Sequence, residues 1–333
     1  MQRSLLLLAV LLPTAAVQAQ NFVPEIHGTI RTKYEYQTEM DASRFEVRTA
    51  RISASGQVLP IVAYKAEVDL CDEGQIKMLD AYARLTPLQG FSITAGQMRV
   101  PFTVDAFRSP HLQYFANRSF IAKQVGNTRD VGATLAYKFG ETVPLTVEGG
   151  IFNGSGLTNQ KVWHKETNYA AKVQAFLSDR LNLTVSTLSI QPQKTRMSSY
   201  DFDVYYSHGP LHVEAEYLYK SYSGNAYDDV HAFNSFVNYN IPLKKFFHRV
   251  ALLARYDMMT NQSDAVTTVS NDDPTLKTTD YKRHRVTGGV TLSFDKAIRA
   301  DLRLNFEKYF YPSGSIAKES ERDKLVVELM LRF

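Results

Sequence analysis

The chain has 333 residues, with 38 basic side chains against 34 acidic ones and a single cysteine. A charge this close to balance gives no reason to expect a nucleic acid partner, and one cysteine, Cys71, excludes a disulfide framework. Beyond the first twenty residues, no stretch approaches the roughly 18 consecutive apolar residues that a membrane-spanning helix needs.

The first residues are typical of a secretory signal peptide. Arg3 precedes an apolar run from Leu5 to Leu12, and Val17-Gln18-Ala19 forms a small-residue cleavage pattern. The sequence therefore predicts that residues 1–19 are removed and that residues 20–333 form one mature domain. Without Arg3 the balance is 37 basic to 34 acidic side chains, so electrostatic arguments must be local.

From Ile26 onward, apolar and polar residues alternate with period two. In the first segment Ile26, Ile30 and Tyr34 fall on one face, while Arg31 and Lys33 fall on the other. A soluble β-domain and a membrane barrel both show this pattern, because in each case one face of a strand is apolar.

Sixteen segments fit this template, separated by turn-forming residues. They are residues 26–36, 45–56, 64–70, 77–85, 91–98, 129–139, 145–152, 168–177, 181–190, 200–207, 211–219, 230–241, 250–258, 285–294, 297–310 and 324–333. The second segment loses its phase near Thr49, which predicts a β-bulge. In the fourth, the alternation places Leu79 with the outward-facing residues.

The last segment favours the membrane barrel. It alternates Leu325, Val327, Leu329 and Leu331 against more polar neighbours and ends on Phe333, which resembles the signal recognised by the outer-membrane barrel assembly machinery. An even strand number and alternating short and long connections agree with this fold. We therefore expect an all-β, transmembrane antiparallel barrel of about 16 strands in the bacterial outer membrane, in contact with its lipid.

A long basic insert between the fifth and sixth segments, about residues 99–129, interrupts the regular spacing. Loops of this length within a compact β-domain are uncommon and usually functional. Five cations stand against Asp105 alone: Arg99, Arg108, Arg118, Lys123 and Arg129. We expect this loop to fold inward and to narrow a water-filled pore with anion-binding groups, since a guanidinium donates two parallel hydrogen bonds to an oxyanion.

A second interpretation of these cations is that they pair with carboxylates of the barrel wall and tie the loop down. Arg129 is the best candidate for such an anchor, because Asp130 follows it at the start of a strand. The wall itself carries both signs of charge. Its inward-facing cations include Arg31, Lys33, Arg299 and Arg303, and its acidic positions include Asp201, Asp203, Glu214 and Glu216.

Signals for catalysis and for metal binding are weak. The chain has no nucleophile-elbow motif and no zinc-binding helix motif. His111 and Ser119 lie in the insert without a third partner nearby, and the spacing of Asp272, Asp273 and Asp280 matches no EF-hand loop. We expect no catalytic residue, no metal and no cofactor.

Three short motifs, in order along the chain, resemble the phosphate-selective porin O and P family of Gram-negative outer membranes. The motifs are FEVRTARISASG with Phe45, Arg48, Arg51 and Gly56; GQMRVPFTVD with Gly96, Pro101 and Phe102; and RDVG with Arg129, Asp130 and Gly132. The resemblance implies a sixteen-stranded barrel, a homotrimer, an inward-folded third external loop, and ion transport of small anions, with phosphate suggested by the family name.

Two other functions fit the same residues. The acidic wall positions favour a general or cation-preferring diffusion porin. A barrel with a plugged lumen would instead serve as an outer-membrane enzyme or anchor.

Overall fold

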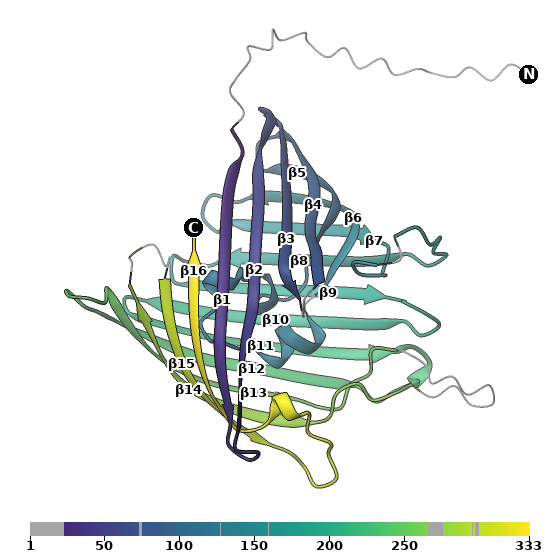
Figure 1. Ribbon diagram of the computed structural model, residues 1–333. Coiled ribbons are helices and arrows are strands. Elements are labelled where there is room, and N and C mark those ends of the chain that lie inside the picture. Colours follow the sequence, from purple (N-terminus) through teal and green to yellow (C-terminus); the bar gives the residue numbers. More distant parts are fainter. Residues whose placement is uncertain are drawn as a thin grey trace, which may run out of the picture.

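The structure, a computed structural model, describes residues 23–72, 75–126, 128–158, 160–265, 276–294, 296 and 300–333. The expected signal peptide, residues 1–19, lies outside these ranges. Within them the chain forms a closed barrel of sixteen strands in which each strand pairs antiparallel with its neighbours in sequence, and β1 pairs with β16 (Figure 1). The predicted fold class is therefore confirmed.

The strands occur close to the predicted segments. They are β1 (Glu25–Gln37), β2 (Ala42–Leu59), β3 (Val62–Asp72), β4 (Gln75–Leu88), β5 (Phe91–Arg99), β6 (Arg129–Phe139), β7 (Leu145–Phe152), β8 (Asn168–Phe176), β9 (Leu181–Ile190), β10 (Met197–His208), β11 (Leu211–Tyr222), β12 (Val230–Pro242), β13 (Arg249–Met259), β14 (Arg283–Ser293), β15 (Ala300–Phe310) and β16 (Lys324–Arg332).

In the residues that the structure describes, helical structure is confined to single turns. The turns are η1 (Asp105–Phe107), η2 (Pro110–Leu112), η3 (Ile121–Val125), η4 (Ser223–Asn225) and η5 (Glu319–Glu321). In the described part of the chain, no helix is long and apolar enough to cross a membrane.

The period-two alternation seen in the sequence corresponds to the two faces of the barrel wall. On β15, Asp301, Arg303 and Glu307 are almost fully buried, whereas Phe306 and Phe310 between and beyond them are about half exposed. Polar side chains thus face the interior, and apolar ones face outward, as a wall in contact with lipid requires.

The register shifts at several places between β1 and β5, and two of these β-bulges bear on the predicted alternation. The pairs Arg31↔Thr49 and Thr32↔Val47 leave Arg48 as the extra residue of β2, so the bulge predicted near Thr49 is confirmed. A second bulge, between Glu67↔Asp80 and Val68↔Met78, was not predicted. It makes Leu79 the extra residue, and Leu79 is 4% exposed, so its assignment to the outward face was wrong.

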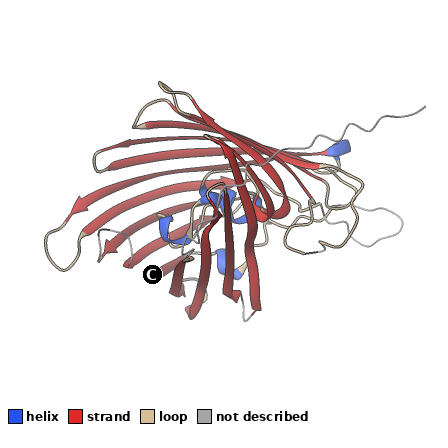
Figure 2. Ribbon diagram, turned by 90° about the horizontal axis from the view of Figure 1, so that it is seen from above, coloured by secondary structure: helices blue, strands red, loops and turns tan. Residues whose placement is uncertain are grey.

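The two ends of the barrel differ in their connections. One end, the short-turn end, carries residues 60–61, 89–90, 140–144, 177–180, 209–210, 243–248 and 294–299. The other, the long-loop end, carries residues 38–41, 73–74, 100–128, 153–167, 191–196, 223–229, 260–282 and 311–323. Figure 2 shows the strands from above, with the loops and turns that connect their ends. The expected alternation of short and long connections holds, apart from the brief turn at 38–41 and the two-residue separation between β3 and β4.

Candidate functional site

The connection between β5 and β6, residues 100–128, has the most distinctive local structure of the chain. Phe102 is fully buried, and Thr103 adopts a φ of 59°, which is unusual for a β-branched residue. Hydrogen bonds hold this kink: the Thr103 amide donates to Ser186 Oγ at 3.0 Å, and its carbonyl accepts from Lys172 Nζ at 2.5 Å. Gly126 packs so closely that a Cβ there would lie 2.5 Å from the Thr103 methyl group.

Apolar side chains of this connection pack against inward-facing residues of the wall. Phe102, Phe120 and Ile121 belong to one buried cluster with Leu218 of β11 and Met259 of β13. Each of these side chains is at most 1% exposed. The 100–128 connection therefore has a hydrophobic attachment to the β8–β15 part of the barrel.

Hydrogen bonds attach the connection to strands far apart around the barrel. Strand side chains bond its backbone at Val104 (Glu216 of β11, 2.6 Å), Ala116 (Arg31 of β1, 2.5 Å, and Asn305 of β15, 2.8 Å), Asn117 (Arg255 of β13, 2.9 Å), Arg118 (Arg285 of β14, 2.7 Å) and Phe120 (Asp257 of β13, 3.0 Å). Most of these partners are charged, so the contacts are charge-assisted and correspondingly strong.

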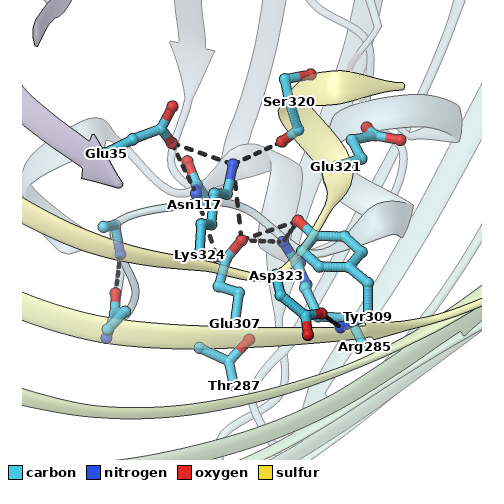
Figure 3. A network of polar contacts seen from close by, with 12 residues as sticks. Glu35, Asn117, Arg285, Thr287, Glu307, Tyr309, Ser320, Glu321, Asp323 and Lys324 are labelled. Atoms are coloured by element: carbon cyan, nitrogen blue, oxygen red, sulfur yellow. Dashed lines mark hydrogen bonds and ion pairs between the residues drawn. The ribbon is translucent and has the colours of Figure 1, made fainter. Parts of the chain in front are cut away.

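A polar network at β14–β16 continues these attachments (Figure 3). Glu307 accepts hydrogen bonds from Arg285 at 3.3 Å, from the Tyr309 hydroxyl at 2.8 Å and from the Asn117 amide at 3.1 Å. Lys324 lies 3.9 Å from Glu307 and donates to Glu35 of β1 at 3.1 Å. The middle of the connection is thus joined to both sides of the β1–β16 seam.

A cavity of about 600 Å³ lies beside the connection toward the long-loop end. We call it the long-loop cavity. Eight basic and two acidic side chains line it: Arg31, Lys33, Arg44, Arg48, Arg118, Lys123, Arg285 and Lys324, with Glu46 and Glu321. Cys71, from β3, also lines it. The excess of cations gives this space a positive potential, although several of them pair with carboxylates.

A second cavity, of about 410 Å³, lies toward the short-turn end and is here called the short-turn cavity. Its charged lining is also mainly basic, with Arg108, Arg249 and Arg303 against Asp301. Gln113 lines both cavities. The side-chain oxygen of Gln113, Oε1, accepts a hydrogen bond from Arg31 at 2.7 Å, while its side-chain nitrogen, Nε2, is buried without a partner. Gln113 therefore separates two basic spaces.

The five predicted cations of the insert have different surroundings. Arg118 and Lys123 line the long-loop cavity, and Arg108 lines the short-turn cavity. Arg99 and Arg129 form a cross-strand pair at the ends of β5 and β6. The structure thus distributes these residues between two cavities and the strand ends.

The five cations of the insert also differ in whether they have a carboxylate partner. Arg108 pairs with Asp105 at 3.1 Å and with Glu214, and Lys123 pairs with Glu321 at 2.9 Å. Arg129 pairs with Asp80 at 2.8 Å and Glu67 at 3.4 Å, which is the anchoring geometry considered above, although Asp130 is not its partner. In the part of the chain that the structure describes, Arg99 and Arg118 pair with no carboxylate and instead both donate to the Ala106 carbonyl.

The guanidinium of Arg118 has no carboxylate within ion-pair distance in the described part of the chain. Burial, together with the positive charge of Arg99, lowers the pKa of the Arg118 guanidinium well below its ordinary value. Since an arginine side chain stays protonated in proteins, this charge is offset only in part, by Asp105, and has no counterion in direct contact among the described residues. An anion beside Arg118 would supply one.

The predicted wall cations also lie on the inward face. Arg31 pairs with Glu328 at 2.5 Å, Lys33 with Glu35 at 2.8 Å, and Arg303 with Glu328 at 2.8 Å. Arg31 and Lys33 line the long-loop cavity, and Arg303 lines the short-turn cavity. Arg299 lies outside the described residues.

A group of four carboxylates occupies the inner face of β10 and β11. Asp201, Asp203, Glu214 and Glu216 are each at most 2% exposed, and Asp203 faces Glu216 directly across the strand pair. Both carboxylate oxygens of Asp203 lack a hydrogen-bond partner. Val104 and Arg108 of the connection contact this group, which lies beneath the connection and outside the lining of either cavity.

The residues considered for catalysis and metal binding do not come together. Ser119 donates its hydroxyl to Asp105 at 2.8 Å, whereas His111 contacts Arg332 at 2.5 Å. Asp280 pairs with Lys318 at 2.7 Å, and Asp272 and Asp273 lie outside the described residues. Across the described ranges, no group of three or more His, Cys, Asp or Glu residues could hold a metal ion.

Several lining residues were not singled out from the sequence. Lys324 continues the inward-facing alternation of the last strand by one position, and Arg48 is the extra residue of the predicted bulge. The inward position of each could therefore have been predicted from the sequence. The position of Gln113 could not have been predicted, because it is a neutral residue in an irregular loop.

The barrel is similar to solved outer-membrane protein structures. An anion-selective porin from Comamonas acidovorans aligns over 94% of this chain and 100% of its own, with 11% identity and a TM-score of 0.64. The trimer form of OmpT, an outer membrane protein of Vibrio cholerae, aligns over 94% and 99%, with 11% identity and a TM-score of 0.60. OmpF of Salmonella typhi, in complex with daunomycin, aligns over 93% and 97%, with 12% identity and a TM-score of 0.60.

At these identities the likeness establishes the fold alone. No curated protein sequence matches the chain. The family model described as phosphate-selective porin O and P matches residues 25–229, which is more than half of the chain. This match covers the basic connection and the strands on both sides of it. The chain is a porin of the bacterial outer membrane and belongs to the phosphate-selective porin O and P family.

Proposed function

We propose that this porin passes small anions by passive diffusion, and that residues 100–128 fold into the barrel and narrow its lumen. The main support for anion passage is the charge of the cavity linings. Eight basic side chains and two acidic ones line the long-loop cavity, and the short-turn cavity beyond Gln113 is also mainly basic. A lining of one sign concentrates ions of the opposite sign and repels the others.

Contacts around the barrel support the inward fold. The connection bonds side chains of β1, β11, β13, β14 and β15, all of which belong to the inward-facing sets of their strands. Strands so far apart in a closed barrel are reached together only by a segment that crosses the interior. On this proposal Gln113 and Arg31, which are joined at 2.7 Å, lie at the narrowest point.

The acidic wall gives less support to a cation-preferring channel. Asp201, Asp203, Glu214 and Glu216 are buried under Val104 and Arg108, so their charges are separated from the cavities by the connection. Arg118 is instead placed for an oxyanion, since its guanidinium lines the long-loop cavity and has no carboxylate partner in the described ranges. We propose that phosphate is among the anions that bind there, in keeping with the family description.

The remaining features follow from the same proposal. Passive diffusion needs no cofactor and no catalytic group, so we propose a channel and not an enzyme. We further propose a homotrimer, because one similar structure is the trimer form of OmpT. We also propose that the outer-membrane barrel assembly machinery inserts the chain and recognises Phe333 as part of its signal.

Single-channel recording in a planar bilayer under a potassium chloride gradient tests the proposal. We expect a reversal potential of the sign given by chloride permeation, and a chloride current that falls when phosphate is added. A cation-selective reversal potential would refute anion passage. An anion-selective current that phosphate leaves unchanged would refute the oxyanion site alone, and a folded barrel without conductance would refute the channel.

Cys71 offers a second readout in the unmodified protein, because it lines the long-loop cavity and is the only cysteine of the chain. Methanethiosulfonate reagents with a sulfonate group should modify it faster than reagents with a trimethylammonium group, after correction for their rates with a free thiol. Cys71→Ser controls for other reactions. The opposite order of rates would mean that the cavity does not concentrate anions.

A further inference from the structure

A groove of about 750 Å³ lies at the long-loop end between the 153–167 connection and the ends of β6 and β7. Its strand side is formed around Ala133 and Ile151, and its loop side by Lys161, Val162, Trp163 and His164. It has no part in the lining of the two basic cavities, so the proposed anion route does not account for it.

The strand side of the groove belongs to the outer surface of the barrel. Ala133 pairs with Ile151, which pairs in turn with Tyr169. Ile151 is 61% exposed, whereas Thr134, the next residue after Ala133, is buried on the opposite face. The small Ala133 side chain beside Ile151 leaves room against an apolar wall that faces the bilayer.

The loop side of the groove is both aromatic and basic. Trp163 is 98% exposed and is preceded by Val162, which is 55% exposed. Lys161 and His164 flank these two residues and also line the groove. Exposing so much apolar surface to water is unfavourable, and tryptophan is enriched where a membrane meets water.

The positive charge of this rim at neutral pH comes from Lys161. Glu166, the acidic residue of the groove, pairs with Arg196 at 3.4 Å. Among the described residues, Lys161 forms no ion pair. A positive charge above an apolar, membrane-facing wall is complementary to a lipid that carries a phosphate group.

We infer that this groove binds an anionic lipid of the outer leaflet, with an acyl chain against Ala133 and Ile151 and the lipid phosphate beside Lys161 and His164. Trp163 then lies at the level of the head groups. The inference concerns a binding site on the outer wall and is independent of ion selectivity.

Trp163 is the only tryptophan of the chain, so its fluorescence reports on this site alone. The full-length barrel is reconstituted into phosphatidylcholine vesicles that contain a fixed fraction of either brominated phosphatidylglycerol or brominated phosphatidylcholine. We expect the anionic brominated lipid to quench Trp163 at least twice as strongly as the zwitterionic one at equal mole fraction. Aqueous iodide should quench it weakly.

Two variants separate the phosphate contact from general charge effects. Lys161→Gln should abolish the preference for the anionic lipid while preserving quenching by both brominated lipids. Lys165→Gln removes the same charge four residues further along, at a position that does not line the groove, and should keep the preference. Circular dichroism of each variant verifies that the barrel is folded.

Three results would overturn the inference. Equal quenching by the two brominated lipids would mean that the groove has no anion site. Strong quenching by iodide and none by lipid would place Trp163 in water. Protection from both quenchers that is lost when oligomers dissociate would show that a second copy of the chain covers the groove.

Discussion

Arg118 and Arg129 belong to the same basic segment, yet their surroundings give them different roles. Arg129 is held by Asp80 and Glu67, and all three side chains are largely buried. Among the described residues, the Arg118 guanidinium bonds only to the backbone carbonyls of Ala106 and Arg108. Removing Arg129 takes one cation from Asp80 and Glu67, which keep Lys65 at 2.8 Å and 2.9 Å. Removing Arg118 takes an ion-pair partner from no carboxylate of the described residues.

We therefore expect opposite phenotypes from two identical substitutions. Arg129→Gln should lower the free energy of unfolding by about 1–3 kcal/mol and leave the ion preference of the surviving channels unchanged. Arg118→Gln should change stability by less than about 1 kcal/mol, and should shift the reversal potential toward that of an unselective channel. Denaturant unfolding in detergent micelles and bilayer recordings measure the two effects.

Arg180→Gln is a suitable control, because Arg180 is an exposed residue of the 177–180 turn. It should change neither quantity. If Arg118→Gln destabilised the barrel as much as Arg129→Gln did, both arginines would be anchors and the proposed anion site would lose its main residue.

For single residues, the sequence predicts which face of the strand a side chain lies on, but not which residue it contacts. The inward faces of Arg31, Lys33 and Arg303 follow from period-two alternation. The partner of Arg108 is Glu214, on a strand more than a hundred positions further along the chain, and only the closed barrel brings the two together. Gln113 is significant because of its place between two cavities, which residue type does not reveal.

Among the elements, the β10–β11 pair and the 100–128 connection depend on each other. Asp203 and Glu216 are like charges directly opposite on neighbouring strands, an arrangement that destabilises a sheet. The same strand pair provides Glu214 for Arg108 and Glu216 for the Val104 amide. The repulsion is therefore tolerated where it provides acceptors that fix the connection.

Two neutralising substitutions in this carboxylate group should act in opposite directions. Asp203→Asn removes a buried carboxyl group that has no hydrogen-bond partner and faces another carboxyl group, and should raise the free energy of unfolding by up to about 1 kcal/mol. Glu214→Gln weakens the attachment of Arg108, so it should lower that free energy by about 3 kcal/mol and increase the single-channel conductance. A larger loss of stability from Asp203→Asn than from Glu214→Gln would contradict this account.

The strands themselves were predictable because each must present one apolar and one polar face. The bulge at Arg48 left a signal, since Arg48 and Thr49 are consecutive polar residues that break the alternation. The bulge at Leu79 left none, because Met78 and Leu79 are both apolar and either could face outward. An irregular connection has no period, so the course of residues 100–128 could not be derived in this way.

For the whole molecule, the barrel must close between its first and last strands. Beyond the β1–β16 ladder, Gly28 and Phe333 exchange two backbone hydrogen bonds, at 2.7 Å and 3.0 Å. The Phe333 ring lies over Gly28 so closely that a Cβ on residue 28 would be 2.2 Å from it. Closure at this end of the seam therefore depends on a residue without a side chain.

A double-mutant cycle tests this closure in chains refolded from urea into detergent micelles, which removes any effect on cellular assembly. Gly28→Ala should displace the Phe333 ring and lower the free energy of unfolding by about 1 kcal/mol. Phe333→Ala should also destabilise the barrel, because the ring no longer covers the seam. In the double variant the added methyl group has no ring to displace, so the combined loss should fall short of the sum by at least about 0.5 kcal/mol. Strict additivity would mean that the two residues do not meet in the folded barrel, and the stability of the seam would then rest on the β1–β16 ladder alone.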